Sequence, residues 1–194
     1  MKIRHTIIGL AAILTLQANC LNGQPSKVKD YKVTVKGTST MHDWESKVEK
    51  LECKTSYKIE NNDLVEIKDA TLKITVESIK STEGKIMDDK TYDAFKSEQH
   101  PFIIFILRSE NINKSDLTVN LTGTLEMAGE TRPIDLVASY RVLANGDLQI
   151  VGNKKIKMTE FKMKPPKALM GTIKVGDEVN ISFDITLLET SSTI

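Results

Sequence analysis

Apolar and polar side chains alternate with a period of two along most of the chain from Tyr31 onward. The segment 72–76, for example, has Leu72, Ile74 and Val76 in one phase and polar residues in the other. This alternation is typical of half-buried β-strands, because successive side chains of a strand point to opposite faces of the sheet. The pattern recurs in about eight segments, so the sequence predicts an all-β protein.

Short turn sequences separate these segments, at 61–63, 128–130, 145–147 and 175–177. Each is rich in Asn, Asp or Gly, which favour chain reversal. Strands that are joined by short turns are antiparallel neighbours. A sheet of about eight strands can close into a barrel whose interior holds side chains or one small ligand. We therefore predict an eight-stranded antiparallel barrel.

Two segments differ from this pattern. Residues 87–96 carry Met87, Tyr92 and Phe95 at helical spacing and are followed by Pro101, so we expect one short amphipathic helix there. Such a helix either covers one end of the barrel as a lid or only completes the hydrophobic core. Residues 102–107 are apolar in both phases, which predicts a strand covered on both faces.

The N-terminal residues have the layout of a secretory signal. Lys2 and Arg4 precede an apolar run at 7–16, and Ala18 ends a cleavage site. We expect a signal peptide at 1–19, a linker at 20–29, a barrel domain at 30–189 and a tail at 190–194. Cys20 lies where a lipoprotein carries its acyl group. Its alternatives are a disulfide with Cys53 or removal, and only lipidation would place the protein on a membrane.

The composition argues against several functions. The chain has 27 basic and 26 acidic side chains, and this balance does not fit a nucleic-acid-binding protein. His42 and His100 have no partner at metal-ligand spacing, so we predict no metal site. No nucleophile motif or phosphate-binding glycine loop occurs either, so we predict no catalytic residue and no enzymatic activity. A barrel enzyme whose site is assembled from scattered residues stays an alternative.

Several stretches together resemble the YceI-like polyisoprenoid-binding proteins, which have a lipocalin-like barrel. They are TSTMHDWE at 38–45, the expected helix followed by HPFIIF at 100–105, LTGTLEMAGETRPI at 121–134 and KIKMTEF at 155–161. Their order and spacing agree with the family across roughly residues 31–187.

The resemblance implies an exported protein whose barrel holds an apolar, lipid-like ligand, such as a polyprenyl phosphate or a quinone. It implies no other cofactor. The location would be periplasmic or secreted, or the outer membrane if Cys20 is acylated. The sequence leaves the oligomeric state open, a dimer included.

We predict that the ligand contacts the inward phase of the strands together with aromatic side chains at the mouth or on the lid. The strand positions are Leu72, Ile74, Val76, Ile103, Phe105, Leu125, Leu136, Ile181 and Phe183, and the mouth or lid positions are Trp44, Tyr92 and Phe95. A barrel filled by its own side chains would use the same residues. Two other hypotheses therefore stay open: a structural or interaction protein with a filled barrel, and an enzyme on a lipid-like substrate.

Overall fold

The alternating segments form antiparallel β-strands in a computed structural model that describes residues 27–168 and 171–189. The strands of these residues are β1 (Val28–Ser39), β2 (Trp44–Val48), β3 (Leu51–Glu60), β4 (Asp63–Thr75), β5 (Ile79–Ser81), β6 (Phe102–Asn113), β7 (Thr118–Met127), β8 (Glu130–Val142), β9 (Leu148–Lys157), β10 (Lys167–Ala168) and β11 (Ile173–Leu187). Helix α1 (Lys85–Phe95) and two 3₁₀ turns, Val76–Ser78 and Met158–Phe161, complete the described part. The expected signal peptide, the tail and Cys20 lie outside the described residues.

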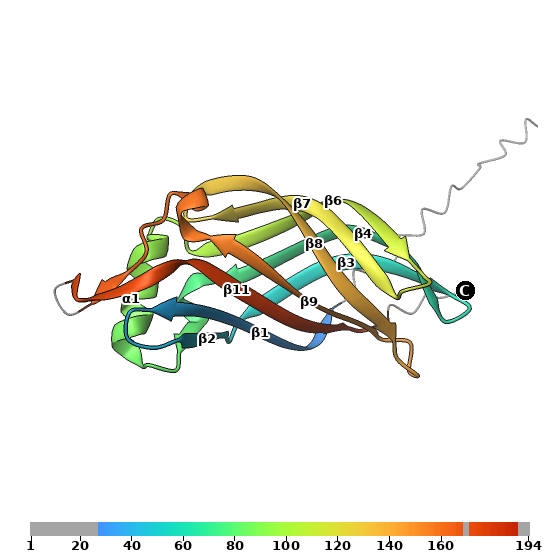
Figure 1. Ribbon diagram of the computed structural model, residues 1–194. Helices are drawn as coiled ribbons and strands as arrows, with labels where there is room; N and C mark the ends of the chain where they lie inside the picture. The colour runs from blue at the N-terminus through green and yellow to red at the C-terminus, as the bar shows by residue number, and fades with distance from the viewer. Residues whose placement is uncertain (1–26, 169–170, 190–194) are drawn as a thin grey trace, which may run out of the picture.

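One curled sheet contains these strands, in the order β3-β4-β6-β7-β8-β9-β11-β1-β2-β5, with β10 beside β11 (Figure 1). Strand β2 pairs with β1 and leads through a bend into β3, which pairs with β4. This connection joins the two ends of the sheet, which is curled into a partly open barrel. The predicted all-β antiparallel barrel is thus confirmed.

The number of strands needs a correction. Eight strands are long, as predicted, but β2, β5 and β10 are additional and have only five, three and two residues. Segments this short contain too few alternations for a period of two to be recognised in the sequence.

In two of the expected turns, both central residues lie in the left-handed region. Asn61 and Asn62 have φ of 52° and 66°, and Ala128 and Gly129 have φ of 53° and 83°. Positive φ at both central residues is typical of the tight hairpin turns that join twisted strands. These turns connect β3 to β4 and β7 to β8.

The turn expected at 175–177 is wrong, because these residues lie inside β11. Gly176 lies beside an irregularity where the register between β1 and β11 shifts between Gly37 and Ser39. A Cβ atom at Gly176 would lie 2.5 Å from the Thr38 hydroxyl oxygen, so the glycine allows a close approach.

The expectation that strand 102–107 is covered on both faces is also wrong. Phe102 and Ile106 point outward, and each is more than a third exposed. The ammonium group of Lys73 lies 3.9 Å from the centre of the Phe102 ring and gives this face a partial cover.

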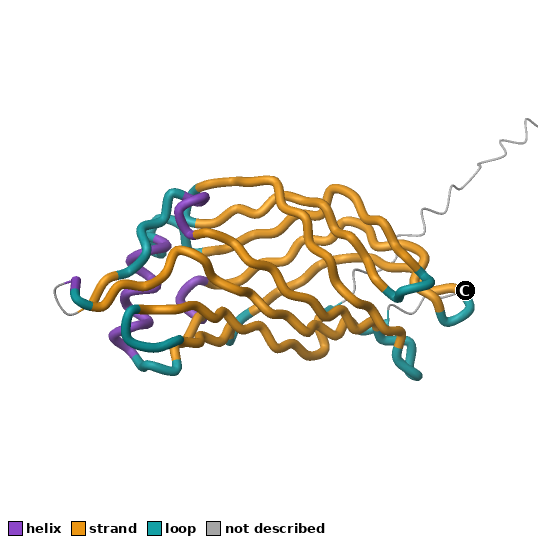
Figure 2. The backbone as a smooth tube through the Cα atoms, in the orientation of Figure 1, coloured by secondary structure: helices purple, strands orange, loops and turns teal. Residues whose placement is uncertain are grey.

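The two ends of the barrel differ. At the end with the β3–β4, β6–β7 and β8–β9 turns, Leu64, Val119 and Leu148 are fully buried. Helix α1 lies at the opposite end, together with the other helical segments (Figure 2). Side chains of α1, together with those of the strands, line the unfilled space inside the barrel.

Candidate ligand-binding cavity

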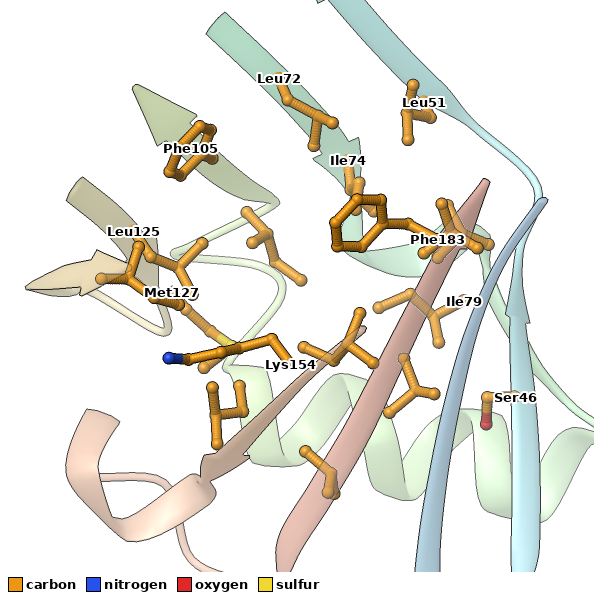
Figure 3. Close-up of a pocket in the computed structure, with 18 of the residues that line it drawn as sticks. Ser46, Leu51, Leu72, Ile74, Ile79, Phe105, Leu125, Met127, Lys154 and Phe183 are labelled. Atoms are coloured by element: carbon orange, nitrogen blue, oxygen red, sulfur yellow. The ribbon is translucent and has the colours of Figure 1, made fainter. Parts of the chain in front are cut away.

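The interior of the barrel contains a cavity of about 240 Å³. Inward-facing residues of the long strands line it, and nearly all of these side chains are apolar (Figure 3). The strands contribute branched aliphatic residues such as Val33 of β1, Leu51 of β3 and Ile150 of β9. A narrow space with such walls suits a hydrocarbon chain, which needs no polar partner along its length.

The cavity brings together ten of the side chains that were predicted to contact a ligand. They are Trp44, Leu72, Ile74, Phe95, Ile103, Phe105, Leu125, Leu136, Ile181 and Phe183. They come from β2, β4, α1, β6, β7, β8 and β11, so the phase of the alternation identifies which face of each strand is inside. Contact between these residues and a ligand stays a prediction.

The other two predicted residues, Val76 and Tyr92, do not belong to the lining. Val76 continues the phase of Leu72 and Ile74, but β4 ends at Thr75 and a 3₁₀ turn begins. There Val76 is fully buried, and its N–H donates to the carbonyl of Pro101 at 2.9 Å. The hydroxyl of Tyr92 donates instead to the carbonyl of Glu77 at 2.8 Å, where α1 packs on the neighbouring segment.

Helix α1 closes one end of the cavity. Met87, Thr91, Ala94 and Phe95 recur at helical spacing and contribute to the lining. The N-terminal half is fixed by Asp88, whose carboxylate accepts a 2.6 Å hydrogen bond from the N–H of Ser81 in β5. Of the two roles expected for this helix, the structure thus favours the lid.

Three inward-facing aromatic rings lie against glycines of the neighbouring strands. Phe183 pairs with Gly152, and a Cβ atom on that glycine would lie 2.6 Å from the ring. The ring of Phe105 lies over Gly123 at the same distance. Trp44 covers its partner Gly37 still more closely, and its indole N–H donates to the carbonyl of Thr38 at 3.2 Å.

Glycine has no side chain, so each ring can lie flat on the sheet instead of projecting across the barrel. This arrangement helps to keep the centre of the barrel unfilled although the lining contains large residues.

The polar groups of the lining are largely satisfied within the protein. The Thr55 hydroxyl donates to the carbonyl of Lys68 at 3.0 Å. Burial raises the pKa of the Cys53 thiol to about 11, so this thiol is protonated at neutral pH and is a poor nucleophile. A disulfide between Cys53 and Cys20 concerns a residue outside the described part.

Sequence reasoning missed several lining residues, of which Lys154 differs most from the others. Val33, Ile67 and Val179 follow the same inward phase and could have been added by extending the alternation. Among the described residues that line the cavity, Lys154 is the one charged side chain. Its signal in the sequence is a charge in the phase shared by Ile150 and Ile156.

The described residues contain no group of three or more His, Cys, Asp or Glu side chains that could hold a metal ion. Within the same residues, no helix is long and apolar enough to cross a membrane.

Comparison with known proteins gives one family match. Residues 21–187 match the sequence model of the YceI-like domain. No curated protein sequence matches the chain.

Several solved structures have a similar fold. BcnA of Burkholderia cenocepacia has a TM-score of 0.65 at 20% identity, with 80% of this chain and 95% of that chain covered. A polyisoprenoid binding domain from Saccharophagus degradans also has a TM-score of 0.65, at 12% identity, with 85% and 97% covered. The YceI protein of Campylobacter jejuni has a TM-score of 0.55 at 20% identity, with 97% and 99% covered. At these identities the likeness shows a shared fold.

Proposed function

Because this chain belongs to the YceI-like domain family, we propose that it binds the long apolar chain of a lipid, such as a polyisoprenoid or an isoprenoid quinone, inside its barrel. The protein would sequester or carry this molecule and leave it chemically unchanged. The observation that carries the proposal is the unfilled apolar cavity beneath α1. The description of the Saccharophagus degradans domain as polyisoprenoid binding supports the same class of ligand.

The binding energy would come from removing hydrocarbon from water. Each buried methylene contributes about 0.8 kcal/mol, which corresponds to roughly a fourfold change in affinity. Because the lining offers few polar partners, the cavity would select for chain length and apolar character along the tail.

A barrel filled by its own side chains would have a continuous core and no such space. The cavity therefore favours a binding protein over that alternative. The protonated state of Cys53 gives no support to a thiol-based reaction on a lipid-like substrate.

We also propose that the protein is exported to the periplasm or secreted. The charged, apolar and small residues at the N-terminus support this location. The mass of the mature protein after expression in a bacterial host would test it, because cleavage and acylation at Cys20 give different masses.

The binding proposal is tested by native mass spectrometry of the purified protein, followed by organic extraction and lipid analysis. We expect a stoichiometric long-chain lipid. The purified, delipidated protein should also bind a series of straight-chain alcohols, with affinity that rises as the chain lengthens.

Two variants give this test its control. Leu72→Trp places a bulky ring in the cavity and should abolish binding of the longer alcohols. Lys73→Trp adds the same ring on the outer face of β4 and should leave binding unchanged. An apo mass, with no binding of any alcohol by the wild-type protein, would refute the proposed function.

A further inference from the structure

The barrel wall has a seam between β8 and β9. Their backbone ladder runs from the pair Val142 and Leu148 to the pair Ala138 and Gly152 and ends there. Both strands continue toward α1, with β8 paired to β7 and β9 paired to β11. Residues 130–137 of β8 and residues 153–157 of β9 therefore face each other without forming paired backbone hydrogen bonds.

Side chains join the two sides of this seam. The ammonium group of Lys154 donates to the backbone carbonyl of Asp135 at 2.7 Å. Closer to the start of β8, the guanidinium of Arg132 donates to the carbonyl of Glu160 at 3.0 Å. Lys162 and Glu130 form an ion pair of 2.8 Å in the same region. The seam is therefore lined by polar groups, whereas the cavity behind it is apolar.

Lys154 belongs to both environments. If the ladder register continued, Lys154 would lie opposite Leu136, and both residues line the cavity. Figure 3 shows Lys154 among the apolar side chains around the cavity. Its methylene groups thus extend the apolar wall, while its charged end reaches the seam.

Resting on the proposed function, we propose that Lys154 binds the anionic head of the ligand, a carboxylate or a phosphate ester, at the seam between β8 and β9. The apolar tail then lies in the cavity, and the head reaches the solvent side of the wall. The ligand class is accordingly a long-chain anionic lipid.

The donors and charges around Lys154 fit an anion. An ammonium group has three N–H donors, and the hydrogen bond to Asp135 assigns one of them within the described residues. The carboxylate of Asp135 points to the outer face, where it accepts a 2.7 Å hydrogen bond from the Thr122 hydroxyl. Arg132 and Lys162 add positive charge along the seam, offset by Glu130.

A hydrogen bond to a charged group contributes enough free energy to change affinity about tenfold or more. A neutral head on the same tail would lose this contribution and keep the contribution of the tail.

The test compares four probes with the same tail: dodecanol, dodecanoate, dodecyl phosphate and dodecyltrimethylammonium. Each displaces the neutral dye N-phenyl-1-naphthylamine from the delipidated protein at pH 8, below the micelle concentration. We expect the wild-type protein to bind at least one anion about tenfold or more tightly than the alcohol, and to bind the cation no better than the alcohol. The carboxylate and phosphate arms show which head the seam prefers.

Three variants separate the charge of Lys154 from its other contributions. Lys154→Met keeps a long apolar side chain and should remove the preference for anions while dodecanol affinity changes less than about twofold. Lys154→Arg should keep the preference. Lys155→Met removes the neighbouring charge on the outer face, where Lys155 pairs with Glu178 at 2.9 Å, and should also keep it.

The inference is overturned if Lys154→Met retains the preference, or if it weakens alcohol and anion binding equally. In both cases the alcohol still binds and the proposed function stands. If no probe binds the wild-type protein, the proposed function fails and the inference fails with it.

Discussion

Replacing Gly152 by alanine tests whether the pairing of rings with glycines keeps the cavity open. A methyl group at this position would lie 2.6 Å from the Phe183 ring, where ordinary contacts are 3.4–4 Å. It would also lie 3.0 Å from the carbonyl oxygen of Val137, so the backbone of β9 cannot simply retreat. The ring must therefore shift by roughly 1 Å, and the unfilled side toward which it can move is the cavity.

Overpacking of this kind costs about 1–3 kcal/mol of stability. We expect Gly152→Ala to lower the free energy of unfolding in urea by that amount. The displaced ring should also lower the affinity for N-phenyl-1-naphthylamine, because it occupies part of the cavity. The Phe183→Leu exchange removes the ring, so the double variant should recover dye binding and should show a coupling of about 1 kcal/mol or more.

Gly123 provides a contrast. A methyl group there would meet the Phe105 ring and, more closely, the backbone carbonyl of Ile106, which removal of the ring does not relieve. We therefore expect Phe105→Leu to rescue Gly123→Ala only weakly. The reasoning is refuted if Gly152→Ala costs as much stability with Leu at position 183 as with Phe, since the ring would then not be the obstacle.

Three further predictions concern single residues. Trp44 is the only tryptophan of the chain and lines the cavity, so saturating dodecanol should change the tryptophan emission; an unchanged spectrum at saturation would place the ligand elsewhere. The second prediction uses a Cys20→Ser variant, in which Cys53 is the only thiol. At pH 8, Cys53 should react with iodoacetamide about a hundredfold more slowly in the folded than in the urea-unfolded protein, because burial raises its pKa from 9.0 to about 11. Equal rates would contradict its burial. Because the pKa of Cys53 is raised in the folded protein, the unfolded protein loses this proton first, and the free energy of unfolding falls as pH rises from 9 to 11. The contribution of Cys53 is fully present below pH 9, amounts to at most about 3 kcal/mol and is lost as pH rises through 11. Cys53→Ala should therefore flatten the fall of the urea midpoint between pH 9 and 11.

The side-chain alternation predicts the inner face of the barrel because it has the period of the strand itself. Leu125 and Ile181 are far apart in sequence, yet both line one cavity since each lies in the inward phase of its strand. The argument fails where a strand ends. Val76 has the right phase and residue type, but the chain leaves the sheet after Thr75 and turns this side chain into the core.

Lys154 was missed for a different reason. A charge in the inward phase looks like an interruption of the strand when only apolar positions are counted. Its meaning depends on where the ladder between β8 and β9 stops, and pairing between strands is not encoded in the pattern of one strand. The sequence pattern also does not predict that the cavity is unfilled. That depends on the contact between Phe183 and Gly152, because a larger residue at position 152 would push the Phe183 ring into the barrel.

An unfilled cavity is costly for a protein of this size. At about 24 cal/mol per Å³, a volume of 240 Å³ corresponds to a cost on the order of 6 kcal/mol. This cost is comparable to the whole stability of many domains. Larger side chains at Gly123 or Gly152 would direct the adjacent rings inward and reduce the volume, yet both glycines lie in contact with aromatic rings of the lining. A ligand that fills the space recovers part of this free energy only when it binds, so the same side chains that lower the stability of the empty barrel would increase its affinity for an apolar chain.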